Sequence, residues 1–379
     1  MESLPHEILI DIVTRLPITS LMQFKCVSKA WYSLAQDHYL LHMYATQNNP
    51  CIILQSEHSL DDQLHVIDTD RHQYENLTRK LAPPFKFSMP KFNIAGSCNG
   101  IHLCSSVSQE SDTIFIYNPF TNESKQLPPT NTSFSNQKVV LGFGFDQKTM
   151  EYKVVRIVYR FPPGQMVCYG TSDVSIHTLG TNSWRSLGEA GYLLDGRSPP
   201  ALVNGSLHWL AHHNKHQQYQ EIVRFDLATE EFSKVPTPNC NTINKGWITI
   251  VEFRGCLSAV VHYNSCCKIE VWVMKDYNVK ESWNKEFVIP AHSPVGFKPD
   301  INLSNRMLEK WFSRGYVRIL CRLKSGEFLL EYGNQSLVSY DPDKEEFKDL
   351  NFEGLPISFD SVAFMGNLVP LQRSIHVQI

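Results

Sequence analysis

Between residues 5 and 16, apolar side chains recur at the spacing of an amphipathic helix. The apolar positions are Ile8, Leu9, Ile12, Val13 and Leu16. Pro5 suits the first helical position, where no N–H is needed, and Pro17 ends the helix because its ring disfavours helical geometry in the preceding residue. The stripe is wider than one neighbouring helix covers, so either the rest of the chain or another protein must cover it.

Further short helices are predicted up to about residue 45. Ser20 and Gln23 have the spacing of a capping box, which predicts that a second helix begins near Leu21. Ser28 is the predicted N-cap of a third helix and Asp37 that of a fourth. A segment of this size rarely buries all of its own apolar surface.

From about residue 46 onward, short alternating apolar runs separated by Gly, Asn, Asp and Pro replace the helical period. A strand, a polar turn and a shorter strand recur at 64–77, 114–128, 174–187, 222–236, 269–287 and 337–350. A further hairpin lies upstream of most copies, at 97–106, 141–161, 202–211, 253–262 and 323–332. Two hairpins make one four-stranded blade, so the six copies predict a β-propeller of about six blades.

The first repeat is short of strands, because only the run 51–55 precedes it. The alternating run 359–371 can complete this blade, which would close the ring and leave no free sheet edge. The predicted fold class is therefore multidomain, α followed by all-β, with a helical segment over residues 1–45 and a propeller over residues 46–379, closed by 359–371. A closed propeller leaves little unpaired surface, so we expect the N-terminal stripe to be an exposed docking face.

The helical segment resembles the F-box, the adaptor-binding module of SCF-type (Skp–cullin–F-box) ubiquitin ligases. The matching positions are Leu4, Pro5, Ile8, Ile12, Leu16, Pro17, Leu21, Cys26, Val27, Ser28, Lys29 and Trp31. The resemblance implies docking on a Skp-type adaptor and, through it, assembly with cullin and RING subunits. The residues expected to form the adaptor contact or its immediate support are Leu4, Pro5, Ile8, Ile12, Leu16, Pro17, Leu21, Val27 and Trp31. Leu4, Cys26 and Trp31 also fit internal packing, and a helical cap on the chain's own domain is the alternative for the whole segment.

The β region is similar to the F-box-associated domain of plant F-box proteins, which is kelch-like in character. The matching residues are Asn118, Pro119, Thr121, Leu127, Pro128, the runs 142–146 and 152–155, Gly205, Leu207, Trp209, Phe225, Asp226, Glu231 and Phe232. Together the two resemblances imply a non-catalytic receptor that binds an unknown target protein for ubiquitination. A non-degradative, adaptor-bound scaffold or regulator and a carbohydrate-active propeller enzyme are the alternatives.

Composition narrows the classes of partner. The chain has 379 residues, of which 42% are hydrophobic and 19% charged, as in an ordinary globular protein. A formal net charge of −3 gives neither a basic surface for nucleic acid nor a polybasic patch for a membrane. The sequence has no signal-peptide pattern and no apolar run of membrane-spanning length, so we expect a cytoplasmic and/or nuclear protein with reduced cysteines.

Motifs for other chemistries are weak. Gly142-x-Gly144 is interpreted as a tight strand turn, because no helix follows it as a dinucleotide-binding fingerprint requires. Two His and Cys clusters lack metal-ligand spacing and predict no metal site: His208, His212, His213 and His216, and Cys98, His102 and Cys104. The sequence predicts no cofactor and no catalytic residue.

Two further expectations concern packing and target binding. The tryptophans expected to pack within or between blades are Trp184, Trp209, Trp272 and Trp283. Residues 302–315 carry apolar side chains at helical spacing, which predicts a helix packed on the propeller rim, with a partner-binding element as the alternative. The target-binding residues are unknown, and the regions suggested for mutagenesis are 128–138, 161–173, 212–220, 238–247 and 290–310.

Overall fold

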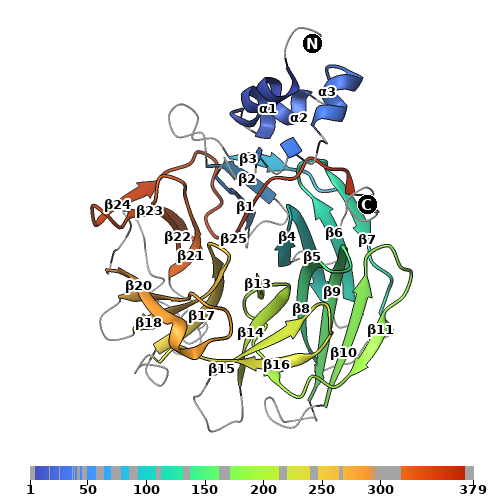
Figure 1. The fold of residues 1–379 in the computed structure, drawn as a ribbon, viewed down its shortest axis with the longest axis vertical. Coiled ribbons are helices and arrows are strands. Elements are labelled where there is room, and N and C mark those ends of the chain that lie inside the picture. Colours follow the sequence, from blue (N-terminus) through green and yellow to red (C-terminus); the bar gives the residue numbers. More distant parts are fainter. Residues whose placement is uncertain are drawn as a thin grey trace.

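The chain forms a helical module followed by six β-sheets arranged around a centre (Figure 1). The structure, a computed structural model, describes residues 5–16, 18–24, 26–35, 37, 39–40, 43–44, 49–56, 64–69, 78–84, 93–107, 112–130, 137–161, 171–212, 220–239, 246–263, 268–290, 292, 294 and 317–371. Among the described residues, the module contains α1 (His6–Thr14), α2 (Ile18–Phe24) and α3 (Lys29–Leu34), and residues 39–40 and 43–44 are also helical. The predicted α segment followed by a β-propeller of six blades is confirmed.

Each sheet is one blade, and its strands follow one another from the centre outward. Blade 1 consists of β25 (Phe359–Phe364), β1 (Cys51–Ser56), β2 (Leu64–Asp68) and β3 (Arg79–Leu81), and blade 2 of β4 (Asn93–Cys98), β5 (Ile101–Val107), β6 (Asp112–Asn118) and β7 (Glu123–Gln126). Blade 3 consists of β8 (Gln137–Asp146), β9 (Glu151–Arg160), β10 (Thr171–Thr178) and β11 (Arg185–Gly188). Blade 4 consists of β12 (Leu193–Leu194) with β13 (Ala201–Val203), β14 (Ser206–His212), β15 (Gln220–Asp226) and β16 (Phe232–Val235). Blade 5 consists of β17 (Gly246–Phe253), β18 (Cys256–Tyr263), β19 (Ile269–Met274), the 3-10 turn η1 (Lys280–Ser282) and β20 (Trp283–Ile289), and blade 6 of β21 (Val317–Arg322), β22 (Phe328–Tyr332), β23 (Ser336–Asp341) and β24 (Glu346–Leu350).

The first two helices begin at positions that differ from the predictions. Pro5 is the N-cap of α1 rather than its first helical residue, because its ψ of 143° is extended while its carbonyl already accepts a hydrogen bond from Leu9. Helix α2 begins at Ile18, so the prediction of a start near Leu21 is wrong. Ile18 and Leu21 lie one turn apart and are both fully buried, and this burial outweighs the capping preference of Ser20.

The other two predicted N-caps are confirmed. The Ser28 hydroxyl accepts a hydrogen bond from the Trp31 amide at 3.3 Å. The Asp37 carboxylate accepts hydrogen bonds from the amides of Tyr39 and Leu40, at 2.8 and 3.0 Å. Local capping chemistry therefore sets where these turns of helix begin.

The propeller ring closes through pairing between the two ends of the β region. Strand β25 pairs antiparallel with β1 in a register that runs from Cys51 opposite Phe364 to Ser56 opposite Phe359. It comes from the run 359–371, in which the sequence predicts the closing strand. Blade 1 thus takes its inner strand from one end of the β region and its other three strands from the opposite end.

The asparagine–glycine pairs form the tight hairpins that the sequence predicts. The φ angles of Asn99 and Gly100 are 48° and 75°, and those of Asn204 and Gly205 are 53° and 69°. Two successive positive φ angles are typical of the two-residue turns that match the twist of paired strands. These hairpin predictions are confirmed.

Gly142 and Gly144 lie inside β8 rather than in a turn, so the interpretation of this pair as a strand turn is wrong. A Cβ on Gly142 would lie 2.7 Å from the Trp209 ring in blade 4, and one on Gly144 would lie 2.7 Å from Leu227. The glycines are therefore required because the neighbouring blade packs directly against the backbone of β8.

The inner strand of blade 4 is interrupted, a feature that the repeat pattern does not predict. Strands β12 and β13 both pair with β14, and residues 195–200 separate them. A Cβ on Gly196 would lie 2.7 Å from Val140 of blade 3, so this segment packs tightly against the adjacent inner strand. The interruption places residues 196–199 in the central part of the propeller.

Two tryptophans connect neighbouring blades. The Trp184 indole N–H donates to the Pro128 carbonyl of blade 2 at 2.9 Å, and the Trp283 indole N–H donates to the Pro236 carbonyl of blade 4 at 2.9 Å. The other two, Trp209 and Trp272, pack in the hydrophobic cores between blades 3 and 4 and between blades 4 and 5. The packing role predicted for all four is confirmed.

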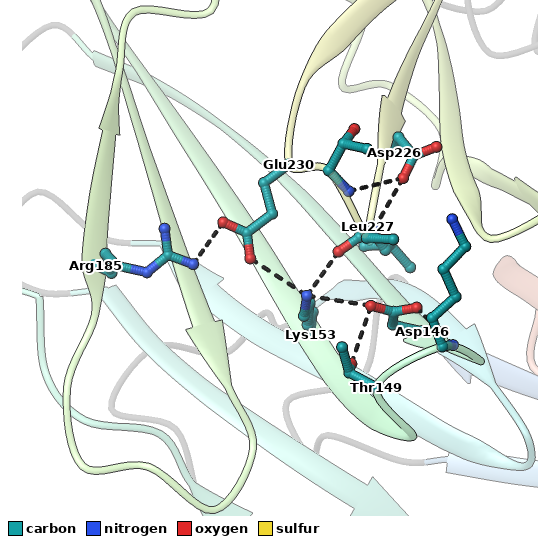
Figure 2. A network of polar contacts seen from close by, with 10 residues as sticks. Asp146, Thr149, Lys153, Arg185, Asp226, Leu227 and Glu230 are labelled. Atoms are coloured by element: carbon teal, nitrogen blue, oxygen red, sulfur yellow. Dashed lines mark hydrogen bonds and ion pairs between the residues drawn. The ribbon is translucent and has the colours of Figure 1, made fainter.

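A buried ion cluster, formed by Lys153, Asp146 and Glu230, joins blades 3 and 4 (Figure 2). Lys153 on β9 donates to the Leu227 carbonyl at 2.7 Å, and its ammonium lies 3.3 Å from a carboxylate oxygen of each acid. Burial raises the pKa of Asp146, but hydrogen bonds from a turn amide, Thr149 and Lys153 outweigh that effect and hold the pKa below its ordinary value. The runs 142–146 and 152–155 that carry the resemblance therefore serve contacts between blades.

Candidate functional site: the outer face of the helical module

The helical module packs on the rim of the propeller, beside blades 1 and 2 (Figure 1). Its buried residues form one hydrophobic cluster with residues of β1, β2, β4, β5, β6 and β25, and they are Ile10, Val13, Ile18, Leu21, Leu34, Ala35, Leu40 and Tyr44. The rim is apolar here because Tyr117, Phe120 and Phe364 of the propeller belong to this cluster. The expectation that the closed propeller leaves the whole stripe exposed is therefore wrong.

A strap, residues 365–371, runs from β25 beneath the helices toward β7 (Figure 1). Gly366 approaches α2 so closely that a Cβ there would lie 2.3 Å from Cδ1 of Ile18. The Asn118 side-chain amide donates to two carbonyls of the strap, at 3.0 and 3.2 Å, and so fixes the strap on blade 2. The strap thus forms part of the surface on which α2 packs.

Helix α1 has an inner and an outer face. Ile10 and Val13 are each 2% exposed, whereas Ile8 and Ile12 are 49% and 47% exposed. Ile8 and Ile12 lie one turn apart and therefore share the outer face. Burial of the exposed half of each isoleucine by a partner would contribute about 1 kcal/mol per side chain to the free energy of binding. This outer face is the part of the predicted stripe that remains available to a partner.

Other exposed apolar residues extend the candidate surface onto the rest of the module. Pro5 precedes α1, and Val27 lies in the turn between α2 and α3; both are exposed, as predicted site residues should be. Tyr32 and Tyr39 are also exposed, and neither was among the residues predicted from the sequence. For Tyr32 the signal is its position directly after Trp31, because adjacent residues on a helix point about 100° apart.

The remaining predicted residues support the module from inside. Leu21 is fully buried, and Leu16 and Trp31 are partly buried and pack against the same cluster. Support was one of the two roles predicted for them, and the buried position of Leu21 excludes direct contact with a partner. Leu4 and Pro17 lie outside the described residues.

Charged side chains of both signs border the outer face. Arg15 and Asp11 form an ion pair at 2.7 Å that is largely exposed, and Glu7 and Lys29 are exposed as well. Exposed ion pairs of this kind contribute at most about 1 kcal/mol to stability. An apolar patch bordered by polar groups is typical of a protein–protein interface.

The two His and Cys clusters of the sequence have structural roles where they are described. His208 is buried, with Nδ1 3.1 Å from a main-chain carbonyl and Nε2 2.7 Å from the Tyr277 hydroxyl. Cys98 and Cys104 pack in different hydrophobic clusters, so the fold does not bring them together. Among the described residues, no group of three or more His, Cys, Asp or Glu side chains is placed to hold a metal ion. His213 and His216 lie outside the described part of the chain.

Most of the stretches suggested for target binding lie outside the described residues, and so does the predicted helix at 302–315. Of the stretch 161–173, the described residues are Phe161 and 171–173, and Thr171 pairs with Arg160 where β10 begins and β9 ends. Within the described ranges, no helix is long and apolar enough to cross a membrane.

Comparisons with known proteins agree with both parts of this architecture. Residues 52–352 match the family model of the F-box associated beta propeller domain, and residues 1–45 match the F-box-like model. The F-box protein At3g07870 of Arabidopsis thaliana is 39% identical, over 97% of this chain and 92% of its own length. From the same plant, F-box protein CPR1 is 28% identical over 97% of this chain and 89% of its own length, and F-box/kelch-repeat protein At3g23880 is 26% identical over 88% of each. The chain therefore belongs to the F-box-associated β-propeller family and is a plant F-box protein, with an F-box-like helical module followed by the propeller.

Proposed function

We propose that this chain is the substrate-recognition subunit of an SCF-type ubiquitin ligase. The outer face of the helical module docks on a Skp-type adaptor, which links it to cullin and RING subunits, and the propeller binds a target protein. The observation that carries the proposal is the pair of half-exposed isoleucines, Ile8 and Ile12, on a helix whose other face is fixed to the propeller. The F-box-like match over residues 1–45 supports the same class of adaptor.

In this proposal the chain itself makes and breaks no bond. It holds the target near the enzyme that carries ubiquitin, and so raises the effective concentration of the target at that enzyme. The buried cluster between the helices and blades 1 and 2 makes this a defined geometry rather than a flexible tether. The adaptor and the target would then be held at fixed positions relative to each other.

The adaptor contact is tested by co-purification of the full chain with a Skp-type adaptor. The double variant Ile8→Asp, Ile12→Asp should lose at least about tenfold in affinity, because two apolar contacts are lost and two carboxylates would have to be desolvated. Val279→Asp is the matched control, since Val279 is 45% exposed on blade 5, away from the module. Equal capture of the adaptor by the double variant, or no capture by the wild-type chain, would overturn the proposal.

A second measurement separates a degradative receptor from a scaffold or regulator. Point variants are preferable to deletion of residues 1–45, because the deletion would expose the propeller side of the buried cluster. A captured target whose lifetime in cells lengthens with the Ile8→Asp, Ile12→Asp variant supports the receptor. A captured partner whose lifetime is the same with both forms favours the scaffold.

A further inference from the structure

A cavity of about 430 Å³ lies among the inner strands of the propeller. Its wall is formed mainly by residues from the first half of four inner strands, β4, β8, β21 and β25, whose arrangement around the centre is visible in Figure 1. Residues 196–199, Gln55, Ser105 and Asn334 complete the wall. Since each of these strands contributes its first half, the cavity lies toward one face of the propeller. No described residue of the helical module lines it, so adaptor docking would leave it accessible.

The charged groups of the cavity are balanced by fixed partners. Arg197 Nε lies 2.8 Å from both carboxylate oxygens of Asp195. Arg318 Nη1 lies 3.6 Å from Glu331 and 3.8 Å from Asp360. Each guanidinium is therefore neutralised locally, and the wall favours a ligand recognised by hydrogen bonds rather than by net charge.

Neutral polar side chains of blades 1 and 2 face the same cavity. Gln55 and Ser105 line it although they are only 9% and 4% exposed, and within the described parts of the chain their side chains have no hydrogen-bond partner. Strand register places Gln55 beside Asp360 and Asn93 beside Ser105. Neither residue is among those whose polar atoms are sealed from solvent without a partner, so these atoms open into the cavity and can bond directly to a group that enters it.

The chemistry of this wall matches a polypeptide main chain. A side-chain amide offers one acceptor and N–H donors, which is the same combination as a peptide group. The described lining residues include no aromatic side chain and thus offer no stacking surface for a sugar ring or a base. We propose that this cavity binds an extended segment of the target protein through its main chain, with Gln55 and Ser105 as hydrogen-bonding residues. The inference rests on the proposed function in one respect, namely that the target is a protein.

The test uses the full chain and a displayed library of short peptides as the probe. Peptides selected on the wild-type chain are synthesised, and their affinities are measured for wild type, Gln55→Leu and Ser105→Ala. Each variant should bind about tenfold more weakly, and N-methylation of the bound peptide backbone should have a similar effect. Gln126→Leu is the matched control, because Gln126 is exposed on the outer strand of blade 2, and it should bind as wild type does.

Three outcomes would overturn the inference: no peptide is selected, the selected peptides bind Gln55→Leu and wild type equally, or a saccharide from a glycan array binds in a Gln55-dependent way. Circular dichroism of each variant establishes that it is folded. Capture of the Skp-type adaptor is measured on the same preparations. A chain that binds peptides at the cavity but captures no adaptor contradicts the proposed function alone, whereas the reverse result contradicts this inference alone.

Discussion

Replacement of Lys153 by methionine is expected to destabilise the propeller by about 3 kcal/mol. Methionine keeps the length of the side chain but cannot donate a hydrogen bond or carry a charge. In the structure the ammonium lies 3.3 Å from one oxygen each of Asp146 and Glu230, and 2.7 Å from the Leu227 carbonyl. The variant would leave both carboxylates without the cation that lies between them.

The expected loss of stability follows from the contacts that Asp146 and Glu230 keep without Lys153. Removal of one partner of a buried ion pair typically costs about 3–5 kcal/mol, because a buried charge is left uncompensated. Asp146 keeps a hydrogen bond from the Thr149 hydroxyl at 3.0 Å, and Glu230 keeps its ion pair with Arg185. These retained contacts place the expected cost near the lower end of the range.

Urea denaturation followed by tryptophan fluorescence measures this cost. Lys234→Met is the matched control, because it makes the same substitution in an exposed ion pair with Glu221 and should cost less than about 1 kcal/mol. Asp146→Asn in the same background should reduce the effect of Lys153→Met, since the two residues are energetically coupled. A cost for Lys153→Met no greater than that of the control would refute the reasoning.

Other perturbations test the helix contact, a buried histidine and a contact between blades. Gly366→Ala should lower the stability by about 1–3 kcal/mol and speed amide hydrogen exchange in α2, because its Cβ would lie 2.3 Å from Cδ1 of Ile18. Adding Ile18→Val removes that methyl group and should restore part of the protection of α2 from exchange. Burial lowers the pKa of His208 from 6.5 to about 4, so in the folded protein the ring stays neutral until the pH falls toward 4. The full folding stability is therefore present above pH 6.5, and up to about 3 kcal/mol of it is lost as the pH falls from 6.5 toward 4, because only the unfolded chain takes up a proton at this residue. Denaturation across this pH window should give a flatter curve for His208→Gln than for wild type, and parallel curves would contradict the assignment. Trp283→Phe removes the donor to the Pro236 carbonyl and should cost about 1 kcal/mol in thermal unfolding, whereas an unchanged transition would show that the bond contributes nothing.

Features of the fold that depend only on residues adjacent in the sequence could be predicted from it. The Asn99–Gly100 hairpin needs only two residues that tolerate positive φ, and the blades follow from repeated hairpins of this kind. The start of α2 and the role of Gly142 could not be predicted, because both depend on distant contacts. Ile18 meets Gly366, and Gly142 meets a ring from another blade.

The same limit applies to the candidate site. The sequence places Ile8 and Ile10 two positions apart, hence on different faces of α1, but it does not reveal which face the propeller covers. That depends on cluster residues such as Phe364 and Leu368, from the far end of the β region. The adaptor role of the outer face stays a prediction, now confined to the exposed part of the stripe.

The strap has a consequence for the order in which the protein can assemble during synthesis. The helical module is synthesised before the propeller, whereas β25 and the strap are synthesised after all the other strands of the described residues. Until residues 359–371 are made, blade 1 lacks its inner strand and α2 lacks the surface around Gly366 on which it packs. Ile18 and Leu21 would stay exposed on a nascent or truncated chain, which makes such chains prone to aggregation. Completion of the ring and the final positioning of the helical module thus depend on the same late residues, so an incomplete chain lacks part of the surface on which its helices pack.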